Sequence, residues 1–311
     1  MGPTQFGSRM RRGTSDAMQC LLRWQEHAHR LGHFTTLIST DIEGGFDRVD
    51  PRSLNNTHIR AEYIPWIQNW ASNHTLKFRH NQRLDPQTYT TNRGIPQGSP
   101  LSPFLFGAYV KKLTDPRIIT SLRSTRLIIS YVDDVLICVS ATSPSDLESL
   151  ARDTWATLVA EASDIGVSFA ENKTKTFHDR VDSWGIGSTV KQLRFLGYWL
   201  ETPPPPLHTA PPRFDYHVSH WSTKANFAFN TLRALSLRSS TGLRSLPILR
   251  ILDACVRSVL LYGLEFWGND ETLVKRADVF IYGAIRNLFD LPIATPHRAI
   301  SSEFSTLPVA I

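Results

Sequence analysis

The sequence predicts an α+β fold, in which helices pack on one face of a sheet, followed by a separate helical domain. As far as Leu200, short runs rich in β-branched residues alternate with helical patterns, and this mixed order is typical of an α+β sheet. Six prolines then fall within 203–212, and they exclude a helix or a central strand there. Beyond them, apolar residues recur at three- and four-residue spacing, which indicates helices.

The composition is that of a folded chain with an excess of positive charge. Its 311 residues are 41% hydrophobic and carry a formal net charge of +6. A chain of this length is expected to divide into two or three compact pieces. The positive charge suits a polyanionic partner such as nucleic acid, although charge spread over the surface also serves solubility.

Neither the cysteines nor the apolar runs point to secretion or to a membrane. Cys20, Cys138 and Cys255 are far apart and form no CxxC pair. We therefore expect no disulfide framework and no zinc knuckle, and a reducing, intracellular compartment. The sequence has no apolar run of about 18 residues and no basic-then-apolar signal after Met1, so it indicates neither membrane insertion nor secretion.

The first expected element is a helix that follows a basic loop with three arginines, Arg9, Arg11 and Arg12. Thr14 or Ser15 suits the N-cap position, and apolar residues at helical spacing continue until Gly32. A strand over 35–41 that ends on Asp41 is expected next, and a helix should follow Asp50 and Pro51. After these we expect a polar-faced β pair over 75–80 and 87–94, and an apolar helix over 102–113 that begins with Ser102 and Pro103.

Two neighbouring aspartates, Asp133 and Asp134, lie between the short apolar runs 127–131 and 135–139. Both runs are too short for a helix, so they predict a hairpin with the acidic pair at its tip. At an effective dielectric of about 20, two carboxylates roughly 4 Å apart repel by on the order of 4 kcal/mol, so a protein that keeps them together usually supplies a cation. The structural alternative is that both aspartates merely cap a tight turn.

The remaining elements complete the sheet and form the helical domain. They are a long amphipathic helix over 143–166, short strands over 167–178 and 192–200, an extended proline-rich connector, and helices over 214–238, 244–263 and 271–288.

Three segments, taken together, resemble a known family. They are STDIEGGFDRVD at 39–50, RGIPQGSPLSPFLF at 93–106 and YVDDVLI at 131–137. In this order they resemble the reverse transcriptases of LINE-like, non-LTR retrotransposons, with group II intron maturases as the next nearest relatives. The resemblance also includes QFGSRMRRGTSDA at 5–17, GVSFAENKTKTF at 166–177, LRFLGYWL at 193–200 and VLLYGLEFWG at 259–268.

The resemblance implies a polymerase right-hand architecture and RNA-directed DNA polymerase activity, with an RNA template, a DNA primer and dNTPs as partners. The expected parts are partial fingers over 1–33, a palm with embedded finger elements over 34–201, a proline-rich connector over 202–213, a helical thumb over 214–290 and a C-terminal extension over 291–311. Because the resemblance begins midway through the family's fingers, we expect an N-terminally incomplete chain that lacks upstream fingers and the element's endonuclease.

Three carboxylates are the metal ligands that the resemblance implies. Asp41, Asp133 and Asp134 would hold two Mg²⁺ ions, with Mn²⁺ as an alternative. Mg²⁺ is commonly bound by one or two carboxylates plus substrate phosphates, and two such ions stabilise the attacking 3′-hydroxyl and the leaving pyrophosphate. The resemblance also implies that Lys173 lies near the triphosphate and protonates pyrophosphate. A solvated surface lysine is the competing interpretation.

The resemblance assigns further residues to the substrates. Phe46 matches a ring that excludes a ribose 2′-hydroxyl, with a core phenylalanine as the alternative. Gly44 and Gly45 replace the bulkier residue and the alanine that are usual before it, which loosens the backbone. The other assignments are Gly94, Gln97, Gly98 and Ser99 to nucleotide and template, Arg12 to phosphates, and Phe195, Leu196 and Gly197 to the primer grip. A rigid proline turn and a flexible basic tail are the alternatives for the first two assignments. The apolar primer-grip residues would also pack the palm against the thumb, and both interpretations can hold together.

Other functions stay open at this stage. A catalytically silent retroelement remnant would bind nucleic acid through phosphate neutralisation but would not extend a primer. An intron maturase would also assist RNA splicing, although YGLEFWG at 262–268 favours the retrotransposon branch. Phe46 disfavours an RNA-templated RNA polymerase. Copying of RNA at a nicked chromosomal site would place the protein in the nucleus, although the sequence has no clear localisation signal.

Overall fold

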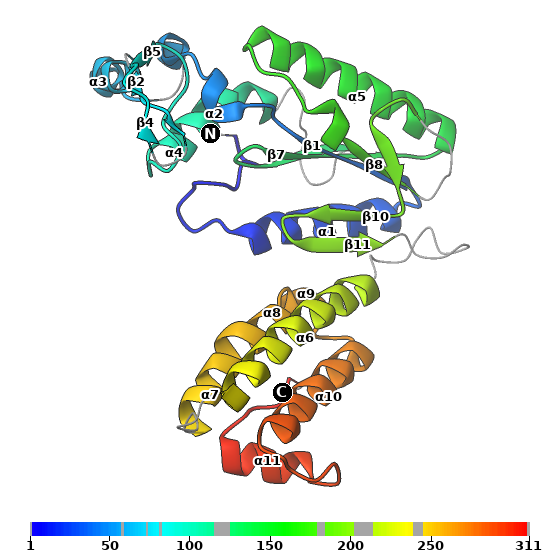
Figure 1. Ribbon diagram of the computed structural model, residues 1–311. Coiled ribbons are helices and arrows are strands. Elements are labelled where there is room, and N and C mark those ends of the chain that lie inside the picture. The colour runs from blue at the N-terminus through cyan, green and yellow to red at the C-terminus, as the bar shows by residue number, and fades with distance from the viewer. Residues whose placement is uncertain are drawn as a thin grey trace. The chain divides into compact units, whose positions relative to one another are not determined.

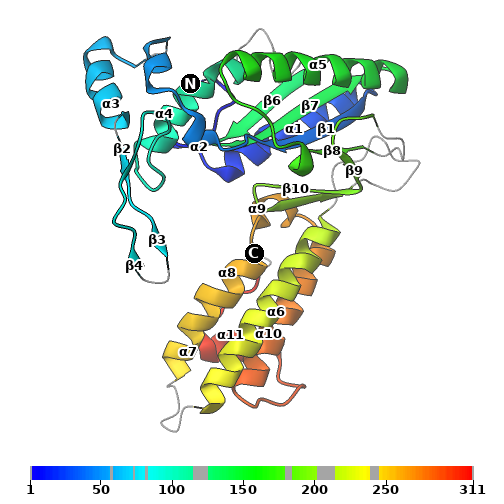
Figure 2. The same cartoon turned by 45° about the horizontal axis from the view of Figure 1, so that its top comes forward.

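The computed structural model describes residues 2–56, 59–72, 74–80, 83–114, 125–178, 184–201, 214–238 and 245–309. The chain divides into two compact units. Unit 1 consists of residues 1–197 with 202–212, and unit 2 consists of residues 198–201 with 213–311. Figure 1 and Figure 2 label the helices and strands of both units.

Unit 1 is built around a five-stranded sheet with the strand order β6–β7–β1–β8–β9. These strands are β1 Phe34–Asp41, β6 Arg126–Tyr131, β7 Asp134–Ala141, β8 Lys175–Phe177 and β9 Ser188–Val190. Strand β7 pairs antiparallel with β6 and with β1, and β1 pairs antiparallel with β8, whereas β9 runs parallel to β8. The sheet is therefore mixed, and the predicted α+β class is confirmed.

Both faces of the central strands are buried. Leu37 and Ile38 are neighbours on β1, so their side chains point to opposite faces, and they are 1% and 0% exposed. Helices α1 Thr14–Arg30 and α5 Pro144–Asp164 both contact β1, and they lie on opposite sides of the sheet in Figure 1. The sheet thus has helices on two faces rather than on the one expected, and the uninterrupted apolar run of β7 is typical of such a strand.

Helix α1 packs its apolar face against the sheet. Met18, Leu21 and Trp24 recur at three-residue spacing and are fully buried. The helix begins at Thr14, where the Asp16 carboxylate accepts a hydrogen bond of 2.7 Å from the Gly13 N–H. The predicted helix is therefore present, but Gly13 occupies the N-cap position instead of Thr14 or Ser15.

Between β1 and β6, unit 1 carries short helices and a two-stranded ribbon. The helices are α2 Gly45–Arg48, the 3₁₀ helices η1 Pro51–Asn56 and η2 Ala61–Tyr63, α3 Ile64–Ala71, α4 Ser102–Tyr109 and the 3₁₀ helix η3 Val110–Thr114. In the ribbon, β2 His74–Leu76 pairs with β5 Tyr89–Thr91, and β3 Arg79–His80 pairs with β4 Arg83–Leu84. The polar-faced β pair that the sequence predicts is confirmed.

Three predicted elements differ in detail. The helix after Pro51 is a 3₁₀ helix, in which the Ser53 N–H donates to the Asp50 carbonyl three residues earlier. The apolar helix over 102–113 is α-helical only to Tyr109 and continues as η3. The strand expected over 167–178 is interrupted by the 3₁₀ helix η4 Glu171–Lys173, so only β8 joins the sheet.

Unit 2 is helical apart from one strand. Its elements are β11 Tyr198–Glu201, α6 Asp215–Arg238, α7 Ser245–Leu252, the π-helical turn η5 Asp253–Arg257, α8 Ser258–Leu260, α9 Leu264–Trp267, α10 Glu271–Leu288 and α11 His297–Phe304. The helix predicted over 244–263 is thus one run with a π-helical turn inside it, and α11 was not predicted. Within the described ranges, no helix is long and apolar enough to span a membrane.

An aromatic cluster joins β11 to the helices of unit 2. The Tyr198 ring is buried and stacks on His217 with ring centroids 5.8 Å apart. His217 Nε2 lies 2.8 Å from the Tyr262 carbonyl, and Nδ1 accepts a hydrogen bond of 3.2 Å from the Trp199 N–H. A Cβ at Gly263 would lie 2.9 Å from the Tyr198 ring, so the glycine of YGLEFWG serves this packing.

Candidate active site

The β6–β7 hairpin presents the two neighbouring aspartates at one end of the sheet. Tyr131 is the cross-strand partner of Asp134, so Val132 and Asp133 form a two-residue turn. Val132 has φ +60, a left-handed conformation that costs a residue other than glycine about 1–3 kcal/mol. The packed strands on both sides hold this strained turn, and with it the Asp133 side chain.

Strand β1 brings the third carboxylate to the same end of the sheet. Asp41 is the cross-strand partner of Asp134, and directly opposite residues in an antiparallel pair have Cβ atoms about 4.5–5.5 Å apart. The Ile42 N–H also donates to the Asp133 carbonyl at 3.1 Å. The fold therefore brings Asp41 to Asp133 and Asp134, which lie more than ninety residues later in the sequence.

Burial and mutual repulsion act on the acidic pair. Burial, followed by the nearby charges of Asp133 and Asp41, raises the pKa of Asp134 to about 6. Desolvation is also the main cause that raises the pKa of Asp133. A bound cation would favour the charged form of both groups.

Lys173 lies against the third carboxylate. Its Nζ donates to Asp41 Oδ2 at 2.5 Å, and this hydrogen bond raises the pKa of the lysine. The backbone supports the contact, because the Ala170 N–H donates to the Asp41 carbonyl at 2.9 Å and the buried hydroxyls of Thr40 and Thr174 lie 2.8 Å apart. The structure thus brings Lys173 to the acidic residues, although its side chain is 64% exposed.

The carboxylates fit a hard metal ion by their chemistry, since oxygen ligands and unneutralised charge suit Mg²⁺. In the part of the chain that is described, however, no group of three or more acidic, histidine or cysteine side chains is arranged to hold a metal ion. Asp41 is paired with Lys173 instead. The assignment of Asp41, Asp133 and Asp134 as metal ligands stays a prediction.

Phe46 follows the β1 end on the short helix α2. Its half-buried ring lies 5.2 Å from the ring of Phe106, and its carbonyl accepts from the Ile95 N–H at 2.9 Å. A Cβ at the preceding Gly45 would lie 2.8 Å from the Phe106 ring. The unusual glycine therefore has a packing reason, because Phe106 fills the space that an alanine would need.

The Gly94–Ser99 segment lies beside α2. Gly94 has φ +88, and a Cβ there would lie 3.1 Å from the Asp47 backbone, so this glycine permits a close approach of two chain segments. Gln97 and Gly98 are exposed, and Ser99 is half-buried, with its Oγ accepting from the Leu101 N–H at 3.3 Å. Gly94 thus has a structural role, whereas Gln97 and Gly98 are accessible to a ligand.

The N-terminal basic segment is anchored along the edge strand β6. The Phe6 N–H donates to the Ser130 carbonyl at 2.8 Å, and the Arg12 guanidinium lies over the Phe6 ring at 5.1 Å. A Cβ at Gly7 would come within 2.6 Å of the Val132 nitrogen. Phe6 and Gly7, just before the arginines, therefore contact β6 and the hairpin turn. The sequence did not reveal this contact. Phe6 and Gly7 are thus not part of a flexible tail.

The residues assigned to the primer grip lie at the end of unit 1. Phe195 is the last residue of β10 Gln192–Phe195 and is 2% exposed. Leu196 and Gly197 follow in left-handed conformations, with φ +49 and φ +87. Phe195 is thus buried, whereas its contact with a thumb or with a primer stays a prediction.

One polar network near the site was not predicted. The Arg48 guanidinium donates to Glu43 Oε2 at 2.9 Å and to Ser168 Oγ at 2.5 Å, and the Glu43 N–H donates to the Ser168 carbonyl. These contacts tie the turn after Asp41 to the chain that follows α5. No local pattern could have indicated them, because Ser168 is 120 residues from Arg48.

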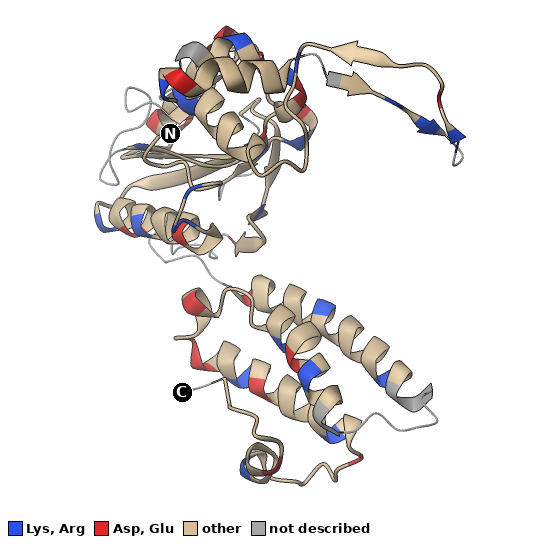
Figure 3. Cartoon of the chain, turned by 90° about the vertical axis from the view of Figure 1, so that its left-hand side faces the viewer, with Lys and Arg blue, Asp and Glu red and all other residues tan. Residues whose placement is uncertain are grey.

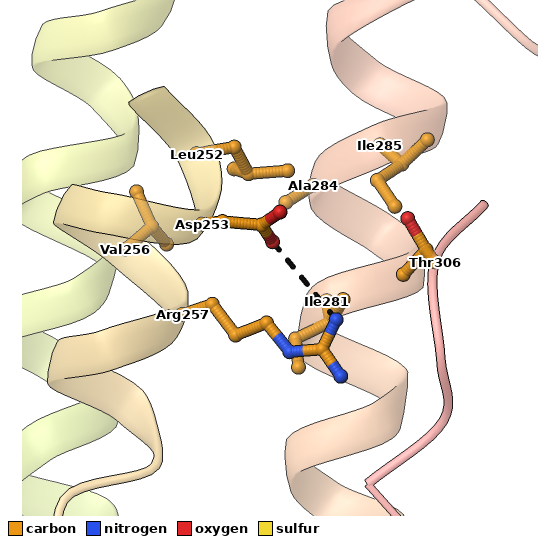
Figure 4. Close-up of a pocket in the computed structure, with 8 residues that line it drawn as sticks. All are labelled: Leu252, Asp253, Val256, Arg257, Ile281, Ala284, Ile285 and Thr306. Carbon is orange, nitrogen blue, oxygen red and sulfur yellow. Dashed lines mark ion pairs between the residues drawn. The ribbon is translucent and has the colours of Figure 1, made fainter. Parts of the chain in front are cut away.

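Unit 2 contains a cavity that is too small to be an alternative active site. Figure 4 shows its lining from η5, α10 and the chain near Thr306. Its volume is about 10 Å³, close to the minimum for one water molecule. Arg257 and Asp253 border it and lie 3.9 Å apart as an ion pair.

Comparisons with known proteins agree on one class of enzyme. Residues 1–200 match the family model described as "Reverse transcriptase (RNA-dependent DNA polymerase)". The chain is 24% identical, over 285 residues, to the retrovirus-related Pol polyprotein from type-1 retrotransposable element R2 of Popillia japonica. This alignment covers 84% of the chain and 37% of the relative, so the chain spans well under half of that polyprotein.

Solved structures of telomerase are also similar to the chain. Telomerase from Candida tropicalis in complex with the TWJ fragment of telomeric RNA has a TM-score of 0.49 and 12% identity, over 95% of this chain and 53% of that one. Apo telomerase from Candida tropicalis has a TM-score of 0.46 and 12% identity, over 94% of this chain and 56% of that one.

Proposed function

Because the chain belongs to the reverse transcriptase family, we propose that it extends a DNA primer on an RNA template with dNTPs. The family predicted from the sequence is confirmed. The observation that carries the proposal is the cross-strand pairing of Asp41 with Asp134, next to Asp133 in the hairpin turn. We assign the palm and embedded finger elements to unit 1 and the thumb to unit 2.

Members of this family use divalent metal ions, and the proposal names two Mg²⁺ ions, with Mn²⁺ as an alternative. Asp41, Asp133 and Asp134 would hold them, and bound metal would stabilise the 3′-hydroxyl oxygen and the pyrophosphate oxygens. Lys173 holds a proton at Nζ beside Asp41. From there the ammonium can donate that proton to the leaving pyrophosphate.

The residues around α2 position the incoming nucleotide in this proposal. The Phe46 ring, held against Phe106, would lie under the sugar and exclude a 2′-hydroxyl. Gln97 and Gly98, both exposed, would contact nucleotide and template, with Ser99 behind them. Arg12 would contact phosphate, and Phe195, Leu196 and Gly197 would position the primer.

The similarity to the R2 polyprotein supports a non-LTR retrotransposon as the source of this reverse transcriptase. The alignment covers only 37% of that polyprotein, so the proposal covers polymerisation alone. A catalytically silent relative that binds nucleic acid is the second candidate, and no observation favours it over the first.

The test is primer extension on poly-rA with an oligo-dT primer, dTTP and Mg²⁺. We expect extension by the full chain and a loss of at least about a hundredfold in Asp133→Ala, since a metal ligand is removed. Asp164→Ala, on the exposed end of α5, is the matched control and should extend normally. If the unaltered chain binds primer–template but never extends it, the silent relative is the better description.

A further inference from the structure

The ribbon between α3 and α4 differs from every other strand pair of unit 1. We call residues 74–80 and 83–93 the basic ribbon. It extends away from the rest of the unit in Figure 2, where β2, β3 and β4 are labelled, and in Figure 3. The Asp85 N–H donates to the Phe78 carbonyl at 2.8 Å, which continues the pairing between β2–β5 and β3–β4.

No part of the described chain covers the basic ribbon. All side chains described within 75–79 and 83–90 are exposed except Asp85, which is half-buried. An isolated two-stranded ribbon is marginally stable in water, and this one exposes large apolar side chains, including Phe78 at 55% and Tyr89 at 38%. The ribbon therefore has surface available for a partner.

The charge of the basic ribbon indicates which partner. It carries four basic residues, Lys77, Arg79, Arg83 and Arg93, and one acidic residue, Asp85. Within the described residues, none of the four cations forms an ion pair with a carboxylate. Figure 3 shows Lys and Arg toward the outer end of the ribbon. Such a surface attracts a polyanion and repels a second copy of itself.

The exposed rings distinguish nucleic acid from other polyanions. Phe78 lies between β2 and β3, Tyr89 lies on β5, and their rings are edge-to-face with centroids 5.2 Å apart. Exposed aromatic rings among basic side chains are the features by which proteins bind single strands, because bases stack on the rings while the cations neutralise phosphates. A duplex offers no exposed base faces to such rings.

We infer that the basic ribbon is a second nucleic-acid contact, outside the active site, which binds single-stranded nucleic acid through Arg79, Arg83, Phe78 and Tyr89. The binding itself is independent of catalysis. Only the identity of the strand as the RNA template rests on the proposed function. The contact would hold unpaired template while the acidic residues act at the primer end.

The first test measures binding of a fluorescent single-stranded oligoribonucleotide by anisotropy over a range of salt, without divalent metal and without dNTPs. Each phosphate contact contributes about 0.7 to the slope of log K against log salt for single strands, so Arg79→Gln with Arg83→Gln should lower the slope by about 1.4. Because no catalysis is measured, the result is valid even for an inactive polymerase.

The matched control for this test is Arg30→Gln with Arg152→Gln. Both arginines are exposed and already paired with a glutamate four residues earlier, on α1 and α5, so the control removes the same net charge elsewhere on unit 1. We expect its salt slope to match the unaltered chain. An unchanged slope in the ribbon variant, or an equal fall in the control, overturns the inference.

The second test removes the rings and keeps the charge. Phe78→Ala with Tyr89→Ala should weaken binding of the oligoribonucleotide by at least about fivefold per ring, and should affect a blunt duplex much less. Phe227→Ala, a 75% exposed ring on α6, is the control. Unchanged affinity in the ring variant, with altered self-association by sedimentation, would assign the ribbon to a protein contact and overturn the inference.

Discussion

At the residue scale, the candidate site depends on contacts that allow little change. The left-handed Val132 holds Asp133 in the turn, and Lys173 is paired with Asp41. The resemblance identified Asp41, Asp133 and Lys173 individually, whereas the left-handed Val132 is a finding of the structure. The structure adds their neighbours, Gly7 beside the turn and Phe106 beside Gly45, and these explain why glycine occupies both positions.

Gly45→Ala tests the packing beside Phe46. The added Cβ would lie 2.8 Å from the Phe106 ring, so we expect the variant to lose about 1–3 kcal/mol of unfolding free energy through overpacking. Urea unfolding measures this. Gly13→Ala, whose Cβ meets only Asp16 at 3.7 Å, is the control, and Phe106→Leu should restore part of the loss. A neutral Gly45→Ala would contradict the close contact.

Asp134→Asn tests the repulsion within the acidic pair. In the folded protein the pKa of Asp134 is raised from 3.8 to about 6, so the folded state binds this proton more tightly than the unfolded chain. The carboxylate therefore destabilises the fold as pH rises through this range. The variant lacks this penalty. Above about pH 6 its unfolding free energy should therefore exceed that of the unaltered protein by on the order of 1 kcal/mol, a small value because solvent screens part of the effect.

The measurement is urea unfolding of both proteins in metal-free buffer, at about pH 4 and about pH 8. The gain in the variant should be absent at the lower pH. Adding Mg²⁺ at the higher pH should stabilise the unaltered protein more than the variant. A gain that is equal at both pH values would show that the side chain, and not its charge, is responsible.

At the element scale, α2 and the turn before it are positioned by distant partners. Gly44 has φ +58 at the N-terminus of this four-residue helix, which is too short to be stable alone. The Arg48 contacts to Glu43 and Ser168 join it to the sheet end. We expect this network to orient Phe46 as well as Asp41.

Arg48→Leu tests that expectation. Its ion pair with Glu43 is largely exposed, so the unfolding free energy should change by only about 0–1 kcal/mol. A shift of the helix should nevertheless lower kcat/KM for dTTP by up to about a hundredfold and weaken discrimination against UTP. Arg52→Leu removes a comparable exposed ion pair with Asp50 and should leave both quantities unchanged. An equal effect of the two substitutions would remove the positioning role.

The elements differ in how well the sequence predicts them. Helices α1, α5, α6 and α10 follow from caps and apolar periodicity, and the β6–β7 hairpin follows from its two apolar runs. The interrupted strand before β8 does not, because Phe169 bridges Ile42 while Lys173 leaves the sheet to reach Asp41. Short segments whose conformation depends on partners far along the chain escape local patterns.

At the scale of the whole molecule, the net charge of +6 is consistent with a polyanionic substrate. The basic ribbon contributes to that positive charge. Because the ribbon is exposed, this part of the charge lies on one defined surface of unit 1. The chain also divides into a sheet-containing unit and a helical unit. This agrees with the change of composition at the proline-rich segment, whose residues 202–213 lie outside the described ranges.

The sequence by itself determined the α+β class, the order of the main elements and the family, because periodicity, caps and ordered motifs are local properties of the chain. The tertiary structure determined the contacts between distant segments, which local patterns do not specify. It placed Asp41 opposite Asp134, paired Lys173 with Asp41, and set Gly7 against the Val132 turn. These contacts join segments more than ninety residues apart, and only the packing of the whole sheet determines which of them meet.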